Sequence, residues 1–225
     1  MPRILFDREL KTLMTKMTDM GNTVDDRIAQ TIEALRTMNL EIAEDVAKSD
    51  NQIDQMEHQI ETMCMNLLAL QQPIASDLRM IATCLKILTD IEREADQCAD
   101  ICEILTVGEL NSNSLAINHV VKMLETARDM FRRAMDVFIS RDVETAKQIC
   151  VDDDIVDGMF SKIILEVCDT ITQAPKNVMC EVDLIFIIKY IERMGDHATN
   201  IAEWVIFMET GVHPDLNEST AQIGG

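Results

Sequence analysis

Pairs of acidic residues four positions apart are the feature of this sequence that could carry chemistry. Glu92 and Asp96 form one pair, and Glu192 and Asp196 form another near the end of the chain. On a helix, side chains four apart share a face, so two carboxylates can converge on one cation. Facing pairs from neighbouring helices would make an oxygen-rich cage for a hard cation or for bridged iron. The candidate metal ligands are Asp50, Asp54, Glu92, Asp96, Asp100, Asp153, Asp157, Glu192 and Asp196.

Chance alone produces several such pairs in so acidic a chain. With 40 Asp and Glu among 225 residues, roughly seven acid pairs of this spacing are expected at random. Two other interpretations therefore stay open. Arg93 and Arg193 could pair with the carboxylates as structural ion pairs, or the aspartates at 50, 54, 153 and 157 could simply be solvated. The metal interpretation is favoured because matching acids recur in both halves of the chain.

Histidine is informative by its absence from these motifs. None of the four histidines follows an acid by three positions, which disfavours the Glu-x-x-His sites of ferritin-like di-iron enzymes. His197, beside Asp196, is a further candidate as a ligand or as a capping residue. The sequence also lacks a P-loop, a nucleophile-elbow motif and a Cys/His zinc pattern. We therefore expect a protein that is not an enzyme.

The elements that must position these acids are predicted to be helices. Aromatic residues make up only 4% of the chain, with 7 Gly and 4 Pro, and this composition disfavours sheets. Breaks occur at Pro73, between Gly108 and Ser114, and at Pro175, with weaker breaks near 39–44 and 140–142. They predict six helices, at roughly 6–40, 43–70, 74–107, 114–140, 143–172 and 178–210.

Apolar residues inside these segments recur every seven positions. One line contains Val46, Ile53, Ile60 and Leu67, a second contains Met56, Met63 and Leu70, and a third contains Ile81, Leu88, Ala95 and Cys102. This spacing is typical of helices that pack in a bundle. Glu92 continues a further line of Leu78 and Leu85 and is therefore predicted at a core-like position. A buried carboxylate there needs a paired cation or a bound metal.

The two halves of the chain are related by an internal duplication. A shift of 103 residues places Asp50, Ile53 and Asp54 on Asp153, Val156 and Asp157, and a shift of 100 places Glu92 and Asp96 on Glu192 and Asp196. Repetition over this length indicates a duplicated structural unit. We therefore predict an all-α fold of two similar three-helix bundles, at 1–110 and 111–210, with a loose tail at 211–225.

Charge and cysteine usage restrict the partners and the compartment. A net charge of −20 repels phosphate backbones and anionic headgroups, so nucleic-acid binding and direct membrane binding are disfavoured. The beginning of the sequence lacks a signal-peptide pattern, and the longest apolar run is too short to span a bilayer. Seven scattered cysteines without a C-x-x-C pair are predicted to be reduced core residues. These features predict a cytoplasmic protein.

The segment from Lys189 to Glu203, KYIERMGDHATNIAE, resembles the signature of the PhoU family of phosphate-uptake regulators. The first half agrees more loosely, through Ile91-Glu92-Arg93 and Asp96. The segment 70–79, LQQPIASDLR, is similar to the connection that leads into the third helix of the family's bundles. Together with the duplication, the resemblance extends over roughly 5–210.

The resemblance implies a cytoplasmic negative regulator of phosphate uptake and of the starvation response. Such proteins link the ATPase subunit of a phosphate ABC transporter to a membrane sensor histidine kinase, and a homodimer is expected. Some members bind metal clusters through acid-x-x-x-acid motifs. By that resemblance the expected cofactors are divalent or trivalent metal ions, iron or zinc first and magnesium or manganese as alternatives. One site would use Asp50, Asp54, Glu92 and Asp96, and the other would use Asp153, Asp157, Glu192 and Asp196.

The first half departs from this pattern at positions where the second half follows it. Ala95 stands in place of Gly195, Gln97 in place of His197 and Asp100 in place of Asn200. Equivalence of the two sites is therefore not expected. Two alternative functions stay open: a carboxylate-bridged di-iron oxidase, and a purely structural helical adaptor without metal.

Overall fold

The fold is all-helical, as predicted. A computed structural model describes residues 3–71, 73–108, 110 and 115–214, and no strand occurs among them. The first half contains α1 (Arg3–Thr37), α2 (Leu40–Ala47), α3 (Asp50–Gln71) and α4 (Ala75–Val107). The second half contains α5 (Leu115–Ser140), α6 (Val143–Gln173), the short 3₁₀ helix η1 (Pro175–Asn177) and α7 (Val178–Thr210).

One predicted helix is interrupted. The segment expected at 43–70 is divided into α2 and α3 at Lys48 and Ser49, where the Ser49 side chain donates a hydrogen bond to the carbonyl oxygen of Val46. Because Ser offers the backbone a local alternative to helical hydrogen bonds, a break at this position is physically reasonable. The corresponding part of the second half is continuous within α6.

The duplication is visible in the turn that follows the first helix of each half. Met38 and Arg141 both adopt left-handed backbone conformations, with φ of 53° and 62°. The next residues, Asn39 and Asp142, then cap α2 and α6 by accepting hydrogen bonds from backbone amides at 3.0–3.3 Å. A polar acceptor at the N-cap satisfies amides that have no partner within the helix. The two turns are related by the same shift of 103 residues.

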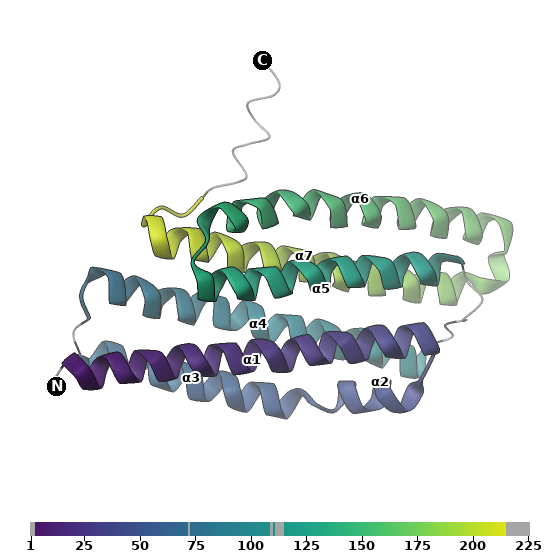
Figure 1. Cartoon of the computed structure of the whole chain (residues 1–225). Coiled ribbons are helices and arrows are strands. Elements are labelled where there is room, and N and C mark those ends of the chain that lie inside the picture. The colour runs from purple at the N-terminus through teal and green to yellow at the C-terminus, as the bar shows by residue number, and fades with distance from the viewer. Residues whose placement is uncertain (1–2, 72, 109, 111–114, 215–225) are drawn as a thin grey trace, which may run out of the picture.

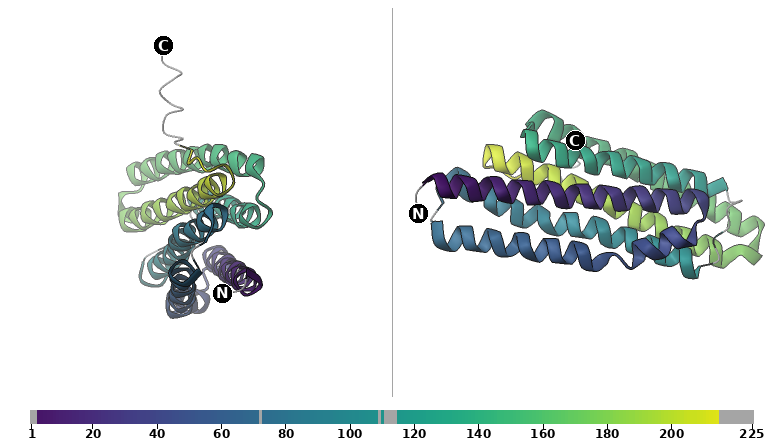
Figure 2. Two further views of the ribbon diagram at one scale, coloured as in Figure 1. Left: turned by 90° about the vertical axis from the view of Figure 1, so that its left-hand side faces the viewer. Right: turned by 60° about the horizontal axis from the view of Figure 1, so that its bottom comes forward.

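The two bundles lie side by side along their length. Viewed end-on, α5, α6 and α7 form one group and α1 to α4 form the other (Figure 2). α4 and α7 run antiparallel between the bundles, with α1 beside α5 (Figure 1). Asp90 of α4 lies 3.0 Å from His197 and 3.2 Å from Asn200 of α7, while the charge of Asp100 acts on Tyr190. Positions 90 and 100 thus face 200 and 190, as they would about a pseudo-twofold axis between the two helices.

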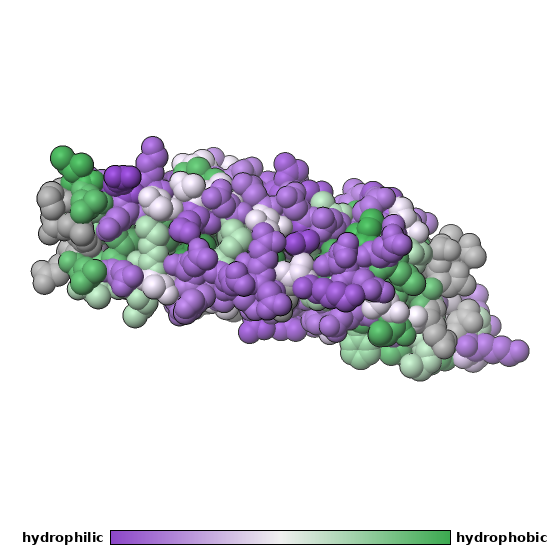
Figure 3. Space-filling model, turned by 90° about the horizontal axis from the view of Figure 1, so that it is seen from below, coloured by the Kyte–Doolittle hydropathy of each residue, from purple (hydrophilic) through white to green (hydrophobic). Residues whose placement is uncertain are grey.

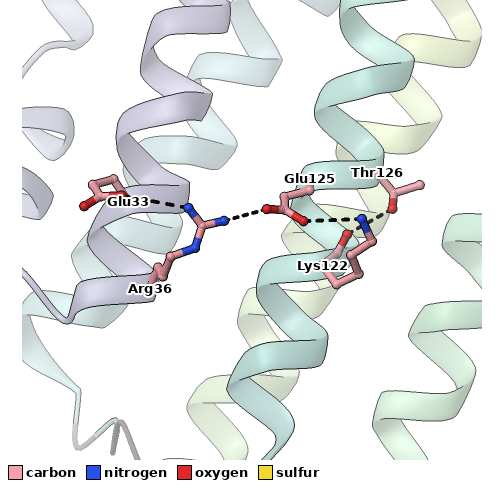
Figure 4. Close-up of polar contacts among 5 residues, drawn as sticks. All are labelled: Glu33, Arg36, Lys122, Glu125 and Thr126. Carbon is pink, nitrogen blue, oxygen red and sulfur yellow. Dashed lines mark hydrogen bonds and ion pairs between the residues drawn. The ribbon is translucent and has the colours of Figure 1, made fainter.

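A single hydrophobic core runs through both bundles, because buried residues of all seven α-helices belong to one contiguous cluster. Ion pairs also join α1 to α5. Arg128 donates to both carboxylate oxygens of Asp25, at 2.7 and 2.8 Å, and Arg36 contacts Glu125 at 2.5 Å (Figure 4). The predicted boundary near 108–114 and the predicted loose tail fall largely outside the described residues.

Hydrophilic residues cover most of the face formed by the first bundle, with hydrophobic residues nearer its two ends (Figure 3). Within the described part of the chain, no helix is long and apolar enough to cross a membrane. α6 lies at the outer edge of the second bundle, on the side away from the first bundle (Figure 1).

Candidate metal centres

Four predicted acids of the second bundle form one cluster, called here the second acidic cluster: Asp153 and Asp157 of α6, and Glu192 and Asp196 of α7. Burial raises the pKa of Asp153 to about 7, and the charges of the other three members contribute to this increase. The pKa values of Asp157 and Asp196 are also raised, first by burial and then by the charge of Glu192. These mutual effects mean that the four carboxylates repel one another across the α6–α7 interface.

Gly195 allows Asp153 to approach the backbone of α7. A Cβ atom added at Gly195 would lie 2.9 Å from Oδ1 of Asp153 and 3.4 Å from Cγ1 of Val156. The first of these distances is shorter than ordinary van der Waals contact, so a side chain at 195 would displace the carboxylate. The glycine therefore positions a member of the second acidic cluster.

The first bundle brings together Asp54, Glu92 and Asp96, and adds Glu57, which the spacing argument missed. Burial raises the pKa of Glu92 to about 7, with contributions from the charges of Asp96, Glu57 and Asp54. The pKa of Glu57 is raised by burial and by the charges of Glu61, Asp54 and Asp96. We call Asp54, Glu57, Glu92 and Asp96 the first acidic cluster. The side chain of Asp50 lies outside the described residues.

The two clusters contain different cations. In the first, Arg93 Nε lies 3.7 Å from Glu92 and Arg93 Nη1 lies 3.4 Å from Asp96, as the ion-pair interpretation foresaw. In the second, Lys189 is the ion-pair partner of Glu192, whereas Arg193 forms no such pair among the described residues. One cation beside four carboxylates leaves each cluster with a net negative charge.

Asp100 and His197 lie at the contact between α4 and α7. The charge of Asp100 acts on Tyr190, whose pKa is raised first by burial. His197 Nδ1 contacts Asp90 at 3.0 Å. Its Nε2 atom is buried and has no hydrogen-bond partner among the described residues.

Comparison with known proteins agrees with the duplicated architecture. The family model described as the PhoU domain matches the chain twice, at residues 17–105 and 120–205. The chain belongs to the PhoU family. It is 32% identical over 219 residues to a protein of Clostridium acetobutylicum named phosphate-specific transport system accessory protein PhoU homolog, covering 97% of this chain and all of that relative. A Rhizobium meliloti protein of the same name is 33% identical, covering 93% of this chain and 89% of that protein.

Crystal structures of PhoU proteins share the fold over most of their length. PhoU from Pseudomonas aeruginosa superposes with a TM-score of 0.84 at 29% identity, covering 92% of this chain and 100% of that one. The PhoU regulatory protein of the phosphate transport system of Streptococcus pneumoniae gives a TM-score of 0.87 at 27% identity, covering 94% and 100%. Sequence and structure therefore agree on the family.

The donor chemistry of both acidic clusters in this PhoU chain fits a metal. Each cluster supplies carboxylate oxygens from two adjacent helices, and burial and mutual repulsion raise the pKa of its members. A hard cation relieves both effects. In the described part of the chain, however, no three His, Cys, Asp or Glu side chains already stand close enough to hold one ion. Metal binding in this PhoU chain would thus require side-chain rotation.

Several acidic and amide side chains of this PhoU chain are buried more deeply than the predicted ligands. Glu94, Gln97 and Glu181 are 0%, 2% and 2% exposed, and neither carboxylate oxygen of Glu94 has a hydrogen-bond partner among the described residues. A signal for Glu94 was present in the sequence, since it continues the seven-residue line of Ile87 and Ile101, both fully buried.

Three details of the predicted core are wrong. Leu78, which was used to place Glu92 in the core, is 46% exposed, and Glu92 is only partly buried. Leu70, at the end of a predicted core line, is 70% exposed. Cys168 is exposed rather than a core residue, although all seven cysteines are free as expected.

Proposed function

We propose that this PhoU chain is a non-enzymatic accessory protein of phosphate-specific transport, which restrains phosphate uptake and silences the starvation response when phosphate is plentiful. The observation that carries the proposal is the family relationship, which extends over 97% of this chain and the whole of a relative named as such an accessory protein. The relatives' names describe accessory proteins rather than enzymes. A regulator of this kind acts by binding other proteins.

The proposed mechanism is that of a cytoplasmic adaptor. One partner is the ATPase subunit of the phosphate ABC transporter, and the other is a sensor histidine kinase. A protein with a net charge of −20 is attracted over long distances to basic surfaces on its partners. Metal ions in the two acidic clusters, with iron or zinc first and magnesium or manganese as alternatives, would neutralise repelling carboxylates and fix the spacing of the helices that carry them.

In the second acidic cluster, the metal would be held by Asp153, Asp157, Glu192 and Asp196. In the first, it would be held by Asp54, Glu92 and Asp96, with Glu57 as a further donor. Asp50 and Asp100 stay predicted members of this site. A bound hard cation would supply charge compensation. The chain itself supplies two adjacent helices for each cluster and, in the second cluster, the glycine beside Asp153.

One complementation experiment tests the proposal. Deletion of the gene should activate phosphate-starvation genes in phosphate-replete medium, and the wild-type gene should restore silencing. A Glu192→Gln, Asp196→Asn variant should lose metal from the second acidic cluster, because two of its four charged donors are removed. Its helices should stay folded, because Glu192 is only partly buried and Asp196 is exposed. Metal content and circular dichroism of the purified variant measure both effects.

The matched control is Asp19→Asn with Asp136→Asn, which removes the same charge from exposed positions outside both clusters. It should keep the wild-type metal content and silencing. Unchanged starvation-gene expression after deletion would contradict the regulatory role. Unchanged metal content with a lowered melting temperature in the Glu192, Asp196 variant would instead reject the metal site and leave the regulatory role standing.

A further inference from the structure

The outward face of α6 contains exposed apolar residues that no part of the described chain covers. Val151, Ile155 and Leu165 are 61%, 54% and 67% exposed. They lie on the side of α6 opposite to Ile149, Val156 and Ile163, which are almost completely buried in the core. Because α6 is a continuous helix at the outer edge of the molecule (Figure 1), this face is open along its length.

The internal duplication shows that the fold does not require apolar residues on this face. The shift of 103 residues places Val151, Ile155 and Leu165 on Lys48, Gln52 and Thr62 of the first bundle. All three counterparts are polar and exposed, as a helix face that meets only water should be. The apolar character of the α6 face is thus specific to the second bundle.

Gly158 lies in the middle of the same face. A Cβ atom added there would meet nothing within 4 Å, so no packing contact within the chain explains the glycine. Glycine in a helix interior lowers helix stability, and its counterpart in the first bundle is Gln55. A glycine on an exposed helix face permits a second backbone to approach closely.

The charges on this face are arranged symmetrically about Gly158, with opposite signs. Asp154 and Lys162 lie four residues before and after the glycine, and Lys147 and Asp169 lie eleven residues before and after it. Val151 and Leu165 lie seven residues before and after it. Among the described residues, no ion pair is formed by Asp154, Lys162 or Asp169, and Lys147 pairs only with Glu144 of its own helix.

From this arrangement we infer that the outward face of α6 binds α6 of a second copy of this chain, antiparallel and with the twofold axis at Gly158. Antiparallel pairing about that point places each residue opposite the residue equally far on the other side of the glycine. Asp154 then faces Lys162 of the second copy, Lys147 faces Asp169, and Val151 faces Leu165. A twofold axis makes every such contact occur twice.

A second copy fits this face better than an unrelated partner does, because one sequence supplies both halves of each charge pair. Parallel pairing in the same register would place Asp154 against Asp154 and Lys162 against Lys162, which is unfavourable. A contact between two single helices is small beside the roughly 1,600 Å² of a standard interface. The dimer should therefore dissociate on dilution. The inference uses none of the residues of the acidic clusters and does not rest on the proposed function.

Charge reversal on this face tests the inference by sedimentation equilibrium of the full chain with a chelator present. The wild type should show a concentration-dependent monomer–dimer equilibrium. Asp154→Lys and Lys162→Asp should each raise the dissociation constant at least tenfold, since each makes two attractive pairs repulsive. The double variant should restore dimerisation, and Asn51→Lys, at the counterpart of Asp154 in the first bundle, should behave as the wild type.

Cross-linking supplies an independent readout of the axis. With helix axes about 8–10 Å apart and Cα atoms about 2.3 Å from each axis, two cysteines at position 158 fall within reach of a disulfide. Gly158→Cys in a Cys168→Ser background should give a covalent dimer on mild oxidation, and Gln55→Cys should not. A wild type that stays monomeric at high concentration, single variants that dimerise normally, or a double variant that is not restored would each overturn the inference.

Discussion

At the scale of single residues, the second acidic cluster depends on Gly195, which has no side chain. Asp153 is both buried enough to have a pKa near 7 and close enough to Gly195 to exclude a Cβ atom. The first bundle has Ala95 at the corresponding position and gathers its acids differently, with Glu57 close to Asp96. The duplicated motif has thus produced two clusters of different geometry.

The close approach at Gly195 predicts the effect of a single methyl group. Gly195→Ala should push the carboxylate of Asp153 away from Glu192 and Asp196 and lower the metal affinity of the second acidic cluster by roughly tenfold or more, the usual effect of disturbing the support of a ligand. Isothermal titration should use a Glu92→Gln, Asp96→Asn background, so that only the second cluster binds. Gly158→Ala is the control, titrated at a concentration at which the chain is monomeric, because an added methyl group there meets nothing within its own chain. Equal affinities would show that Asp153 is not a ligand.

The sequence predicted most of the residues in these clusters but not their depth. Acid spacing identified Asp54, Glu92 and Asp96 because helical periodicity places residues four apart on one face. It missed Glu57, which lies three rather than four positions after Asp54. The shift of 103 residues places Glu57 on Phe160, so the second half has no matching acid. The burial of Glu92 was overestimated because the seven-residue line from Leu78 to Glu92 follows the flank of α4. Only tertiary packing decides which of two neighbouring lines of residues faces the core.

At the scale of elements, α4 and α7 are copies of one helix in which different residues are buried. Both pack between the bundles, and a shift of 100 residues relates the corresponding positions of the two helices. Glu94 of α4 and Met194 of α7 are corresponding residues, and both are fully buried. Burial raises the pKa of Glu94 well above its usual value, and neither of its carboxyl oxygens is hydrogen-bonded within the described chain.

The comparison of Glu94 with Met194 predicts a stabilising substitution. Glu94→Met should raise the free energy of unfolding by about 1–3 kcal/mol, because it removes buried polar atoms that have no partner and substitutes a side chain that the matching position already buries. Urea denaturation followed by circular dichroism measures the change. The reciprocal Met194→Glu should lower stability by a similar amount. A destabilised Glu94→Met protein would show that Glu94 has a polar partner that the structure does not describe.

Two helix boundaries were predicted correctly even where the break in the sequence pattern was weak. Asn39 and Asp142 are residues that favour the N-cap, and the predicted breaks near both were confirmed. The division at Lys48 and Ser49 was missed because Val46 and Ile53 keep the seven-residue spacing across it, with both residues buried. The apolar line continues through the interruption, so periodicity alone could not reveal it.

At the scale of the whole molecule, duplication has produced two bundles that share one hydrophobic core. The ion pairs of α1 with α5 and the polar contacts of α4 with α7 add to this continuity. Unfolding one bundle would expose the apolar faces that α5 and α7 present to the other. The two halves should therefore unfold together, although the sequence predicted them as two similar units.

The chain's one tryptophan allows this cooperativity to be measured. Trp204 lies in α7, where its ring contacts those of Phe207 and His213 edge to face. Its fluorescence therefore reports on the second bundle, whereas circular dichroism reports on all helices. Ile28 is fully buried in α1 of the first bundle, and Ile28→Ala should lower the free energy of unfolding by about 2–5 kcal/mol through the lost transfer energy and the cavity. Since the core is shared, the Trp204 transition should shift by the same amount as the circular dichroism transition, in the wild type and in the variant alike. A Trp204 transition that stays in place while the circular dichroism curve splits would mean that the second bundle is stable without the first.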